Sequence, residues 1–101
     1  RQRSVRAKIE ESQCSVICLQ ETKCDFFDQR AIRKFCPRRF DNFVYSPSVG
    51  ASGGILTAWN GSMFIGELLF QNKFSLSIQF TCNISANKWI LSNIYGPFRH
   101  E

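Results

Sequence analysis

Residues 15–23 read SVICLQETK, an apolar run that ends abruptly on a glutamine, a glutamate and a lysine. Residues 16–19 are continuously apolar and rich in β-branched side chains, a pattern typical of a strand buried on both faces. Such strands are usually parallel and follow a helix, and residues 3–12 (RSVRAKIEES) repeat apolar side chains at helical spacing. The sequence therefore predicts a helix followed by a buried strand, with Glu21 just past the end of that strand.

The remainder of the chain contains one more helical pattern and then only strand patterns. Residues 25–36 are expected to form a helix that Asp25 caps and that ends before Pro37. Strict alternation of apolar and polar side chains, from Phe74 to Phe80, predicts a strand with one buried face. Strands are expected at residues 41–47, 55–59, 63–70, 74–80 and 89–95.

Two glycine-containing segments are expected to form turns between these strands. Residues 49–54 (VGASGG) match no phosphate-binding fingerprint, so we interpret them as a turn whose glycines adopt positive φ. Asn60 and Gly61 are typical of a tight hairpin turn, which would pair residues 55–59 with residues 63–70. The order of elements indicates an α/β fold with mostly antiparallel strands and two helices near the N-terminus.

The composition bounds the class of protein. A length of 101 residues allows one domain, and 44% hydrophobic residues favour a packed core over disorder. No apolar run is long enough to span a membrane, and no secretion signal follows the charged N-terminus. Five cysteines without a C-x-x-C pair, and one histidine (His100) to which we assign no role, lack the spacing of a zinc site. We interpret the cysteines as reduced intracellular thiols, with Cys18 and Cys82 acting as small hydrophobes.

The net charge of +5 is concentrated in the first part of the chain. Residues 1–39 contain ten Lys or Arg and five Asp or Glu, whereas residues 40–101 contain three of each. This distribution suits a polyanionic partner such as nucleic acid, and it equally suits a solvated helix face. The charge alone does not decide between the two.

Two strand ends carry side chains suited to phosphate chemistry. Glu21 lies at the carboxyl end of its strand, where it could bind Mg²⁺, and Lys23 could balance a phosphate. Tyr95 ends the last strand, on the same side as Asn93, and its phenol could donate a hydrogen bond to a phosphoryl oxygen. The alternatives are an exposed Glu–Lys pair and an aromatic side chain that packs at the sheet edge.

Three segments together resemble a known superfamily. They are V-I-C-L-Q-E-T-K (16–23), G-A-S-G-G-I-L (50–56) and S-N-I-Y-G-P (92–97). Their order resembles that in the endonuclease/exonuclease/phosphatase superfamily, and most closely that in apurinic-type endonucleases and the endonuclease domains of LINE-type (non-LTR) retrotransposons. The resemblance implies that residues 1–101 are the N-terminal half of one two-sheet α/β sandwich domain, truncated before its first strand and after its middle.

The resemblance also implies a role for each candidate residue. Glu21 matches the glutamate that binds Mg²⁺ (or Mn²⁺), Lys23 a lysine that supports the charged substrate site, and Tyr95 the catalytic tyrosine that contacts the phosphate. It implies a hydrolase, a DNA endonuclease that is intracellular and nuclear, with DNA as partner and no membrane or identified protein partner.

The chain departs from the superfamily pattern in ways that affect catalysis. Phe98 stands where apurinic-type nucleases often carry an asparagine. The opening asparagine motif would precede Arg1, and the G-D-x-N and S-D-H motifs would follow Glu101. No acid–histidine pair can be proposed as the general base. We therefore expect the chain alone to be catalytically silent.

Two alternatives remain open at this point. One is a non-catalytic nucleic-acid-binding remnant that retains the basic first 39 residues. The other is a phosphoinositide or phospholipid phosphatase of the same superfamily, which Lys23 and the basic face disfavour.

Overall fold

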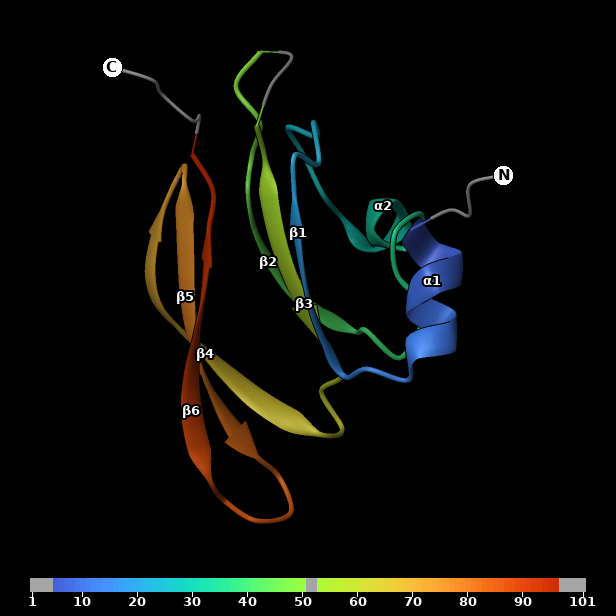
Figure 1. Cartoon of the computed structure of the whole chain (residues 1–101), viewed down its shortest axis with the longest axis vertical. Helices are drawn as coiled ribbons and strands as arrows, with labels where there is room; N and C mark the ends of the chain where they lie inside the picture. The colour runs from blue at the N-terminus through green and yellow to red at the C-terminus, as the bar shows by residue number, and fades with distance from the viewer. Residues whose placement is uncertain (1–4, 51–52, 97–101) are drawn as a thin grey trace.

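The structure is a computed structural model that describes residues 5–50 and 53–96. These residues form two short helices and two antiparallel sheets of three strands each, so the fold is mixed α/β, as predicted (Figure 1). The first sheet has the strand order β1-β3-β2, and the second has the order β4-β5-β6. The elements are α1 (Val5–Ser12), β1 (Val16–Gln20), α2 (Gln29–Ile32), β2 (Asn42–Ser46), β3 (Ile55–Trp59), β4 (Phe64–Asn72), β5 (Ser75–Cys82) and β6 (Lys88–Ile94).

The central strand of the first sheet, β3, is buried along its whole length, which confirms the prediction for residues 55–59. It pairs antiparallel with β1 on one side and with β2 on the other. The expectation of a parallel strand buried on both faces at residues 16–19 is wrong. β1 runs antiparallel to β3 and leaves Cys18 exposed, because it lies at the edge of the sheet with no other partner strand among the described residues.

The helix expected at residues 25–36 is much shorter than predicted. α2 covers only Gln29–Ile32, and Asp28 rather than Asp25 caps it: the Asp28 Oδ1 accepts a hydrogen bond from the backbone N–H of Ala31 at 2.8 Å. The helix stops early because the residues that follow turn to bury their side chains, and this tertiary packing outweighs helical spacing.

The segment after α2 is irregular but well bonded. It carries Cys36 and Phe40 into the core, where neither has any exposed surface. The guanidinium of Arg33 donates hydrogen bonds to the backbone carbonyls of Pro37 and Phe40. These bonds give hydrogen-bond partners to two backbone carbonyls of a segment that has no regular secondary structure.

Asn60 and Gly61 form a turn, as predicted, but the turn does not make a hairpin. The backbone N–H of Met63 donates to the carbonyl of Asn60 at 3.0 Å. The strand that follows, β4, belongs to the second sheet and does not pair with β3. Since β1 and β2 already occupy both edges of β3, no hydrogen-bonding edge remains for β4.

The second sheet packs on the first through alternate side chains of β5. The alternation predicted for this strand is confirmed, because Leu76, Ile78 and Phe80 are buried and the polar residues between them are partly exposed. The ring of Phe80 meets the indole of Trp59 edge to face, with ring centroids 5.2 Å apart. Gly66 allows this contact, since a Cβ there would lie 2.6 Å from the indole of Trp59.

The two helices cover the other face of the first sheet, so the fold has a helical layer and two sheet layers (Figure 1). Apolar side chains from this layer pack on Leu56 and Ala58 of β3. The buried members of the helical layer are Ile9, Phe27, Ile32, Cys36 and Phe40. Neither helix in the described residues is long and apolar enough to cross a membrane.

The five cysteines are free thiols in different surroundings. Cys18, expected to act as a small hydrophobe among apolar residues, is exposed on edge strand β1. Burial raises the pKa of the Cys36 thiol to about 11. Cys82 is only partly buried, and hydrogen bonds from the hydroxyl and backbone N–H of Ser85 lower its pKa.

Candidate functional site

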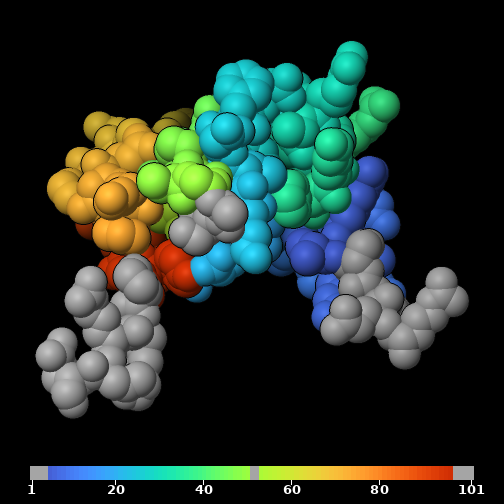
Figure 2. Space-filling view, turned by 90° about the horizontal axis from the view of Figure 1, so that it is seen from above, coloured from blue at the N-terminus to red at the C-terminus, as the bar shows by residue number. Residues whose placement is uncertain are grey.

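Loops from both sheets meet at one end of the molecule, which is the upper end in Figure 1 and the face seen in Figure 2. In the first sheet, strand pairing ends there with Gln20 opposite Ile55. In the second sheet, it ends there with Ser75 opposite Ile94. The segments that follow β1, β4 and β6 and the one that precedes β3 therefore share this end.

A partly buried polar contact between Gln20 and Asn93 joins the two sheets near this end. The side chain of Asn93 is 3% exposed, and its Nδ2 donates to the carbonyl of Leu56 at 3.0 Å and to the Oγ1 of Thr57 at 3.2 Å. The Nε2 of Gln20 donates to the Oδ1 of Asn93 at 3.3 Å and to the carbonyl of Ile94 at 2.7 Å. These bonds tie β6 to β1 and β3, so the residues that follow β1 and β6 are held together.

Backbone pairing continues between the residues after β1 and the residues before β3, but its register shifts by one residue. The backbone N–H of Thr22, not that of Glu21, donates to the carbonyl of Gly54 at 3.1 Å, and that of Lys23 donates to Gly53 at 2.9 Å. Glu21 is therefore an extra residue, as in a β-bulge, and bulges redirect side chains. Glu21 (φ 56°) and Lys23 (φ 58°) both adopt the left-handed conformation, which is uncommon for such residues and clusters at functional sites.

This bulged turn packs directly on Gly54. A Cβ at Gly54 would lie 2.3 Å from the Oγ1 of Thr22 and 3.2 Å from the backbone N of Lys23, and its φ of 93° also favours glycine. The positive φ predicted for the glycines of residues 49–54 is confirmed at all three of them. The segment is thus more than a connection, because it supports the turn that carries Glu21.

Tyr95 lies beside a cavity at the same end of the molecule. Its backbone N–H donates to the carbonyl of Phe74 at 2.8 Å, and both residues line a cavity of about 310 Å³ together with Lys73. Phe74, expected on the buried face of its strand, is 40% exposed because it lies in the turn before β5. The other lining residues are Pro47, Val49, Gly53 and Gly54.

The structure brings the backbones of Glu21 and Tyr95, two of the three predicted site residues, to one place. Glu21 directly follows Gln20, and Tyr95 directly follows the residue whose carbonyl Gln20 binds. Tyr95 lines the cavity, whereas the exposed side chains of Glu21 and Lys23 do not. Among the described residues, no three Asp, Glu, Cys or His side chains form a metal-binding group. A single carboxylate, such as that of Glu21, suits a hard cation like Mg²⁺, which takes its other ligands from water and phosphate.

Four residues at this end of the molecule are not among the predicted site residues. Asn93 could be recognised from the sequence, because strand alternation puts this amide among inward-facing apolar side chains. Gln20 is its hydrogen-bond partner. Lys73 and Phe74 could not be recognised in this way, since their place at the cavity depends on how the two sheets pack. His100 lies outside the described residues.

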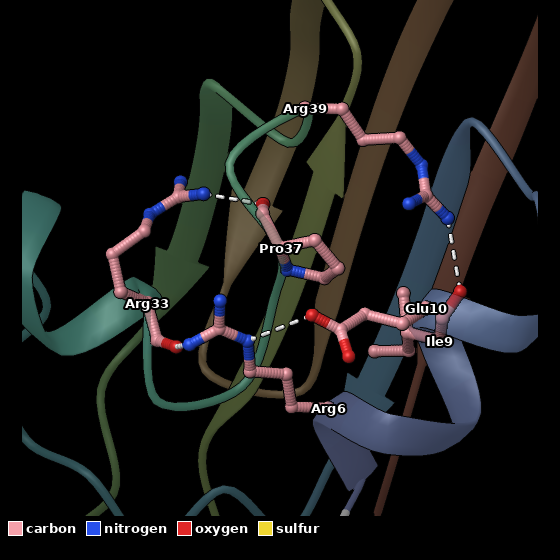
Figure 3. Close-up of polar contacts among 6 residues, drawn as sticks. All are labelled: Arg6, Ile9, Glu10, Arg33, Pro37 and Arg39. Atoms are coloured by element: carbon pink, nitrogen blue, oxygen red, sulfur yellow. Dashed lines mark hydrogen bonds and ion pairs between the residues drawn. The ribbon is translucent and has the colours of Figure 1, made fainter.

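Several arginines among residues 1–39 donate hydrogen bonds to backbone carbonyls within the fold (Figure 3). The Nη1 of Arg6 donates to the carbonyl of Arg33 at 3.0 Å, and the Nη2 of Arg39 donates to that of Ile9 at 2.9 Å. Arg33 itself donates to the carbonyl of Pro37. These guanidinium groups donate to backbone carbonyls, so fewer of their N–H donors are free to bind a polyanion.

No protein family matches this chain at a significant level, and no curated protein does so either.

Proposed function

We propose that this chain is part of a magnesium-dependent phosphodiesterase of the endonuclease/exonuclease/phosphatase superfamily, and that the whole domain is a DNA endonuclease. One observation carries the proposal. The described parts of residues 16–23, 50–56 and 92–97, which resemble superfamily motifs, converge at one end of the fold through the Gln20–Asn93 contact and the Gly54 turn. Segments so distant in sequence have no local reason to meet there.

In this proposal, each candidate residue acts on the scissile phosphodiester. Glu21 would hold Mg²⁺ or Mn²⁺, which would supply positive charge at the phosphate, while Lys23 would balance the negative charge and Tyr95 would donate a hydrogen bond to a phosphoryl oxygen. Water attacks phosphorus in line with the leaving oxygen, and the bond from phosphorus to that oxygen breaks. The proton of the water passes to a base that lies outside this chain, so the chain alone is silent.

The wider fold and location follow from the same proposal. Two packed antiparallel sheets with helices on one outer face support a partial sandwich of the superfamily type. The outer edge of β1 has no partner strand among the described residues, and we expect the opening strand of the whole domain to pair there. With DNA as the substrate, we propose a nuclear location.

Metal-dependent DNA binding tests the role of Glu21. The affinity for a short labelled duplex is measured by fluorescence anisotropy, in Mg²⁺ and in EDTA. Mg²⁺ is expected to tighten binding, and Glu21→Gln to remove that gain. Glu67→Gln, which changes an exposed carboxylate on β4, is the matched control and is expected to keep it. A gain from Mg²⁺ that survives Glu21→Gln contradicts the proposal, whereas salt-sensitive binding that ignores the metal supports a non-catalytic binding module.

Nicking of supercoiled plasmid tests the expected silence. In Mg²⁺, the chain is expected to leave the plasmid intact, because in this proposal the general base lies outside the chain. Robust nicking that Glu21→Gln abolishes would support the site and overturn the silence.

A further inference from the structure

The cavity beside Tyr95 differs in chemistry from the turn that carries Glu21. Its lining combines the β4–β5 turn, with Lys73 and Phe74, and apolar residues that include Pro47 and Val49. Its volume of about 310 Å³ is at the lower end of the range for small-molecule sites. The cavity therefore has room for a nucleobase.

The aromatic wall is held in place by hydrogen bonds within the protein. The Oδ1 of Asn72 accepts from the backbone N–H of Phe74 at 2.9 Å, and the carbonyl of Phe74 accepts from Tyr95 at 2.8 Å. The Oγ of Ser46 donates to the carbonyl of Asn72 at 2.8 Å, which anchors the turn to the first sheet. Because the backbone around Phe74 is bonded on these sides, the turn that carries its ring is held in place before any ligand binds.

The wall pairs an aromatic face with a positive charge. The ring of Phe74 is 40% exposed, and the Nζ of Lys73 lies 5.4 Å from its centroid. Proteins that bind single-stranded nucleic acid use this pairing, since the ring stacks on a base and the cation attracts the backbone phosphate. Neither group takes part in the metal role proposed for Glu21.

From this pairing we infer that the cavity accepts one unpaired nucleobase of a DNA strand, stacked on Phe74, while Lys73 contacts the adjacent phosphate. The inference rests on the proposed function for the choice of DNA, and it extends that function to a preference for unpaired bases next to the cleavage site. A base that stays stacked and paired in a duplex has no free face to offer to Phe74.

The test compares two ligands of equal length in EDTA, where no divalent ion contributes. One is a short labelled oligothymidylate, and the other is an abasic oligomer with the same phosphates and no bases. Stacking on Phe74 is expected to make the oligothymidylate bind at least about fivefold tighter. Phe74→Ala is expected to remove this preference, Phe74→Trp to keep it, and Phe70→Ala, at a 53% exposed phenylalanine of β4, to leave it unchanged.

The charge is tested separately. Lys73→Gln is expected to weaken both ligands by the same factor, while Lys88→Gln, at the start of β6, changes neither. Equal affinity for the two ligands in the unmodified chain overturns the inference, and so does a preference that Phe74→Ala leaves intact in a variant whose amide spectrum is native. The proposed function fails on a different observation, an Mg²⁺ effect that is indifferent to Glu21→Gln, so the two failures are distinguishable.

Discussion

Replacing Asn93 with alanine removes the amide that joins the two sheets. The lost side chain is 3% exposed and donates at 3.0 Å to the carbonyl of Leu56 and at 3.2 Å to the Oγ1 of Thr57. Each such bond contributes about 0.5–1.5 kcal/mol net, and leaving buried partners unpaired moves the cost toward the upper value. We therefore expect Asn93→Ala to lower the free energy of unfolding by about 2–3 kcal/mol.

Urea denaturation followed by tryptophan fluorescence measures this loss, because Trp59 lies between the sheets and is 6% exposed. With a slope of about 1 kcal/mol per molar urea, the midpoint is expected to fall by about 2–3 M. Ile94→Ala changes a neighbouring side chain that is 66% exposed, and it is expected to shift stability by less than about 0.5 kcal/mol. If Asn93→Ala behaves like this control, the buried amide does not hold the sheets together and the reasoning is refuted.

Three further changes test other parts of the structure. Gly54→Ala is expected to cost about 1–3 kcal/mol, because φ is 93° and the new Cβ would meet the Oγ1 of Thr22 at 2.3 Å; an unchanged urea midpoint would contradict the close packing. Cys82 is expected to be alkylated faster than Cys36 near neutral pH, since hydrogen bonds lower the pKa of Cys82 and burial raises that of Cys36 to about 11; equal labelling rates by mass spectrometry would be the opposite result. Arg33→Lys is expected to cost about 1–2 kcal/mol in thermal or urea unfolding, because an ammonium cannot reproduce a guanidinium that bonds two carbonyls at once, and full stability would show that those bonds matter little.

The features that sequence predicted correctly are those decided by neighbouring residues. The alternation in β5 follows from one buried and one exposed face, and the buried run in β3 follows from a central position. The positive φ of the glycines at residues 49–54 reflects their own backbone freedom. In each case the residue type and its immediate neighbours carry the information.

The failures concern partners that are distant in sequence. β1 has the composition of a central strand, yet it lies at an edge and pairs only with β3 among the described residues. Asn60 and Gly61 have the chemistry of a hairpin, but β3 had no free edge to offer. Residues 25–36 have helical spacing but form only a short helix, because burial of Phe40 and the hydrogen bonds of Arg33 favour an irregular backbone.

The residues of the candidate site could be predicted from the sequence, whereas their arrangement could not. Glu21 and Tyr95 stand out because each ends a strand, and the resemblance gives each a role. Their common location could not be predicted, because it depends on the packing of one sheet on the other and on the bonds of Gln20 and Asn93. The cavity wall at Phe74 is likewise a product of packing.

The central claim is that Glu21 binds a divalent ion beside Tyr95, and paramagnetic broadening by Mn²⁺ tests it most directly. In amide NMR spectra of the intact chain, dilute Mn²⁺ is predicted to broaden the signals of Thr22, Gly54 and Tyr95 and to spare that of Gly61 at the opposite end. Glu21→Gln is predicted to remove this broadening. Broadening that is spread over the surface, or that persists unchanged in Glu21→Gln, would contradict the account.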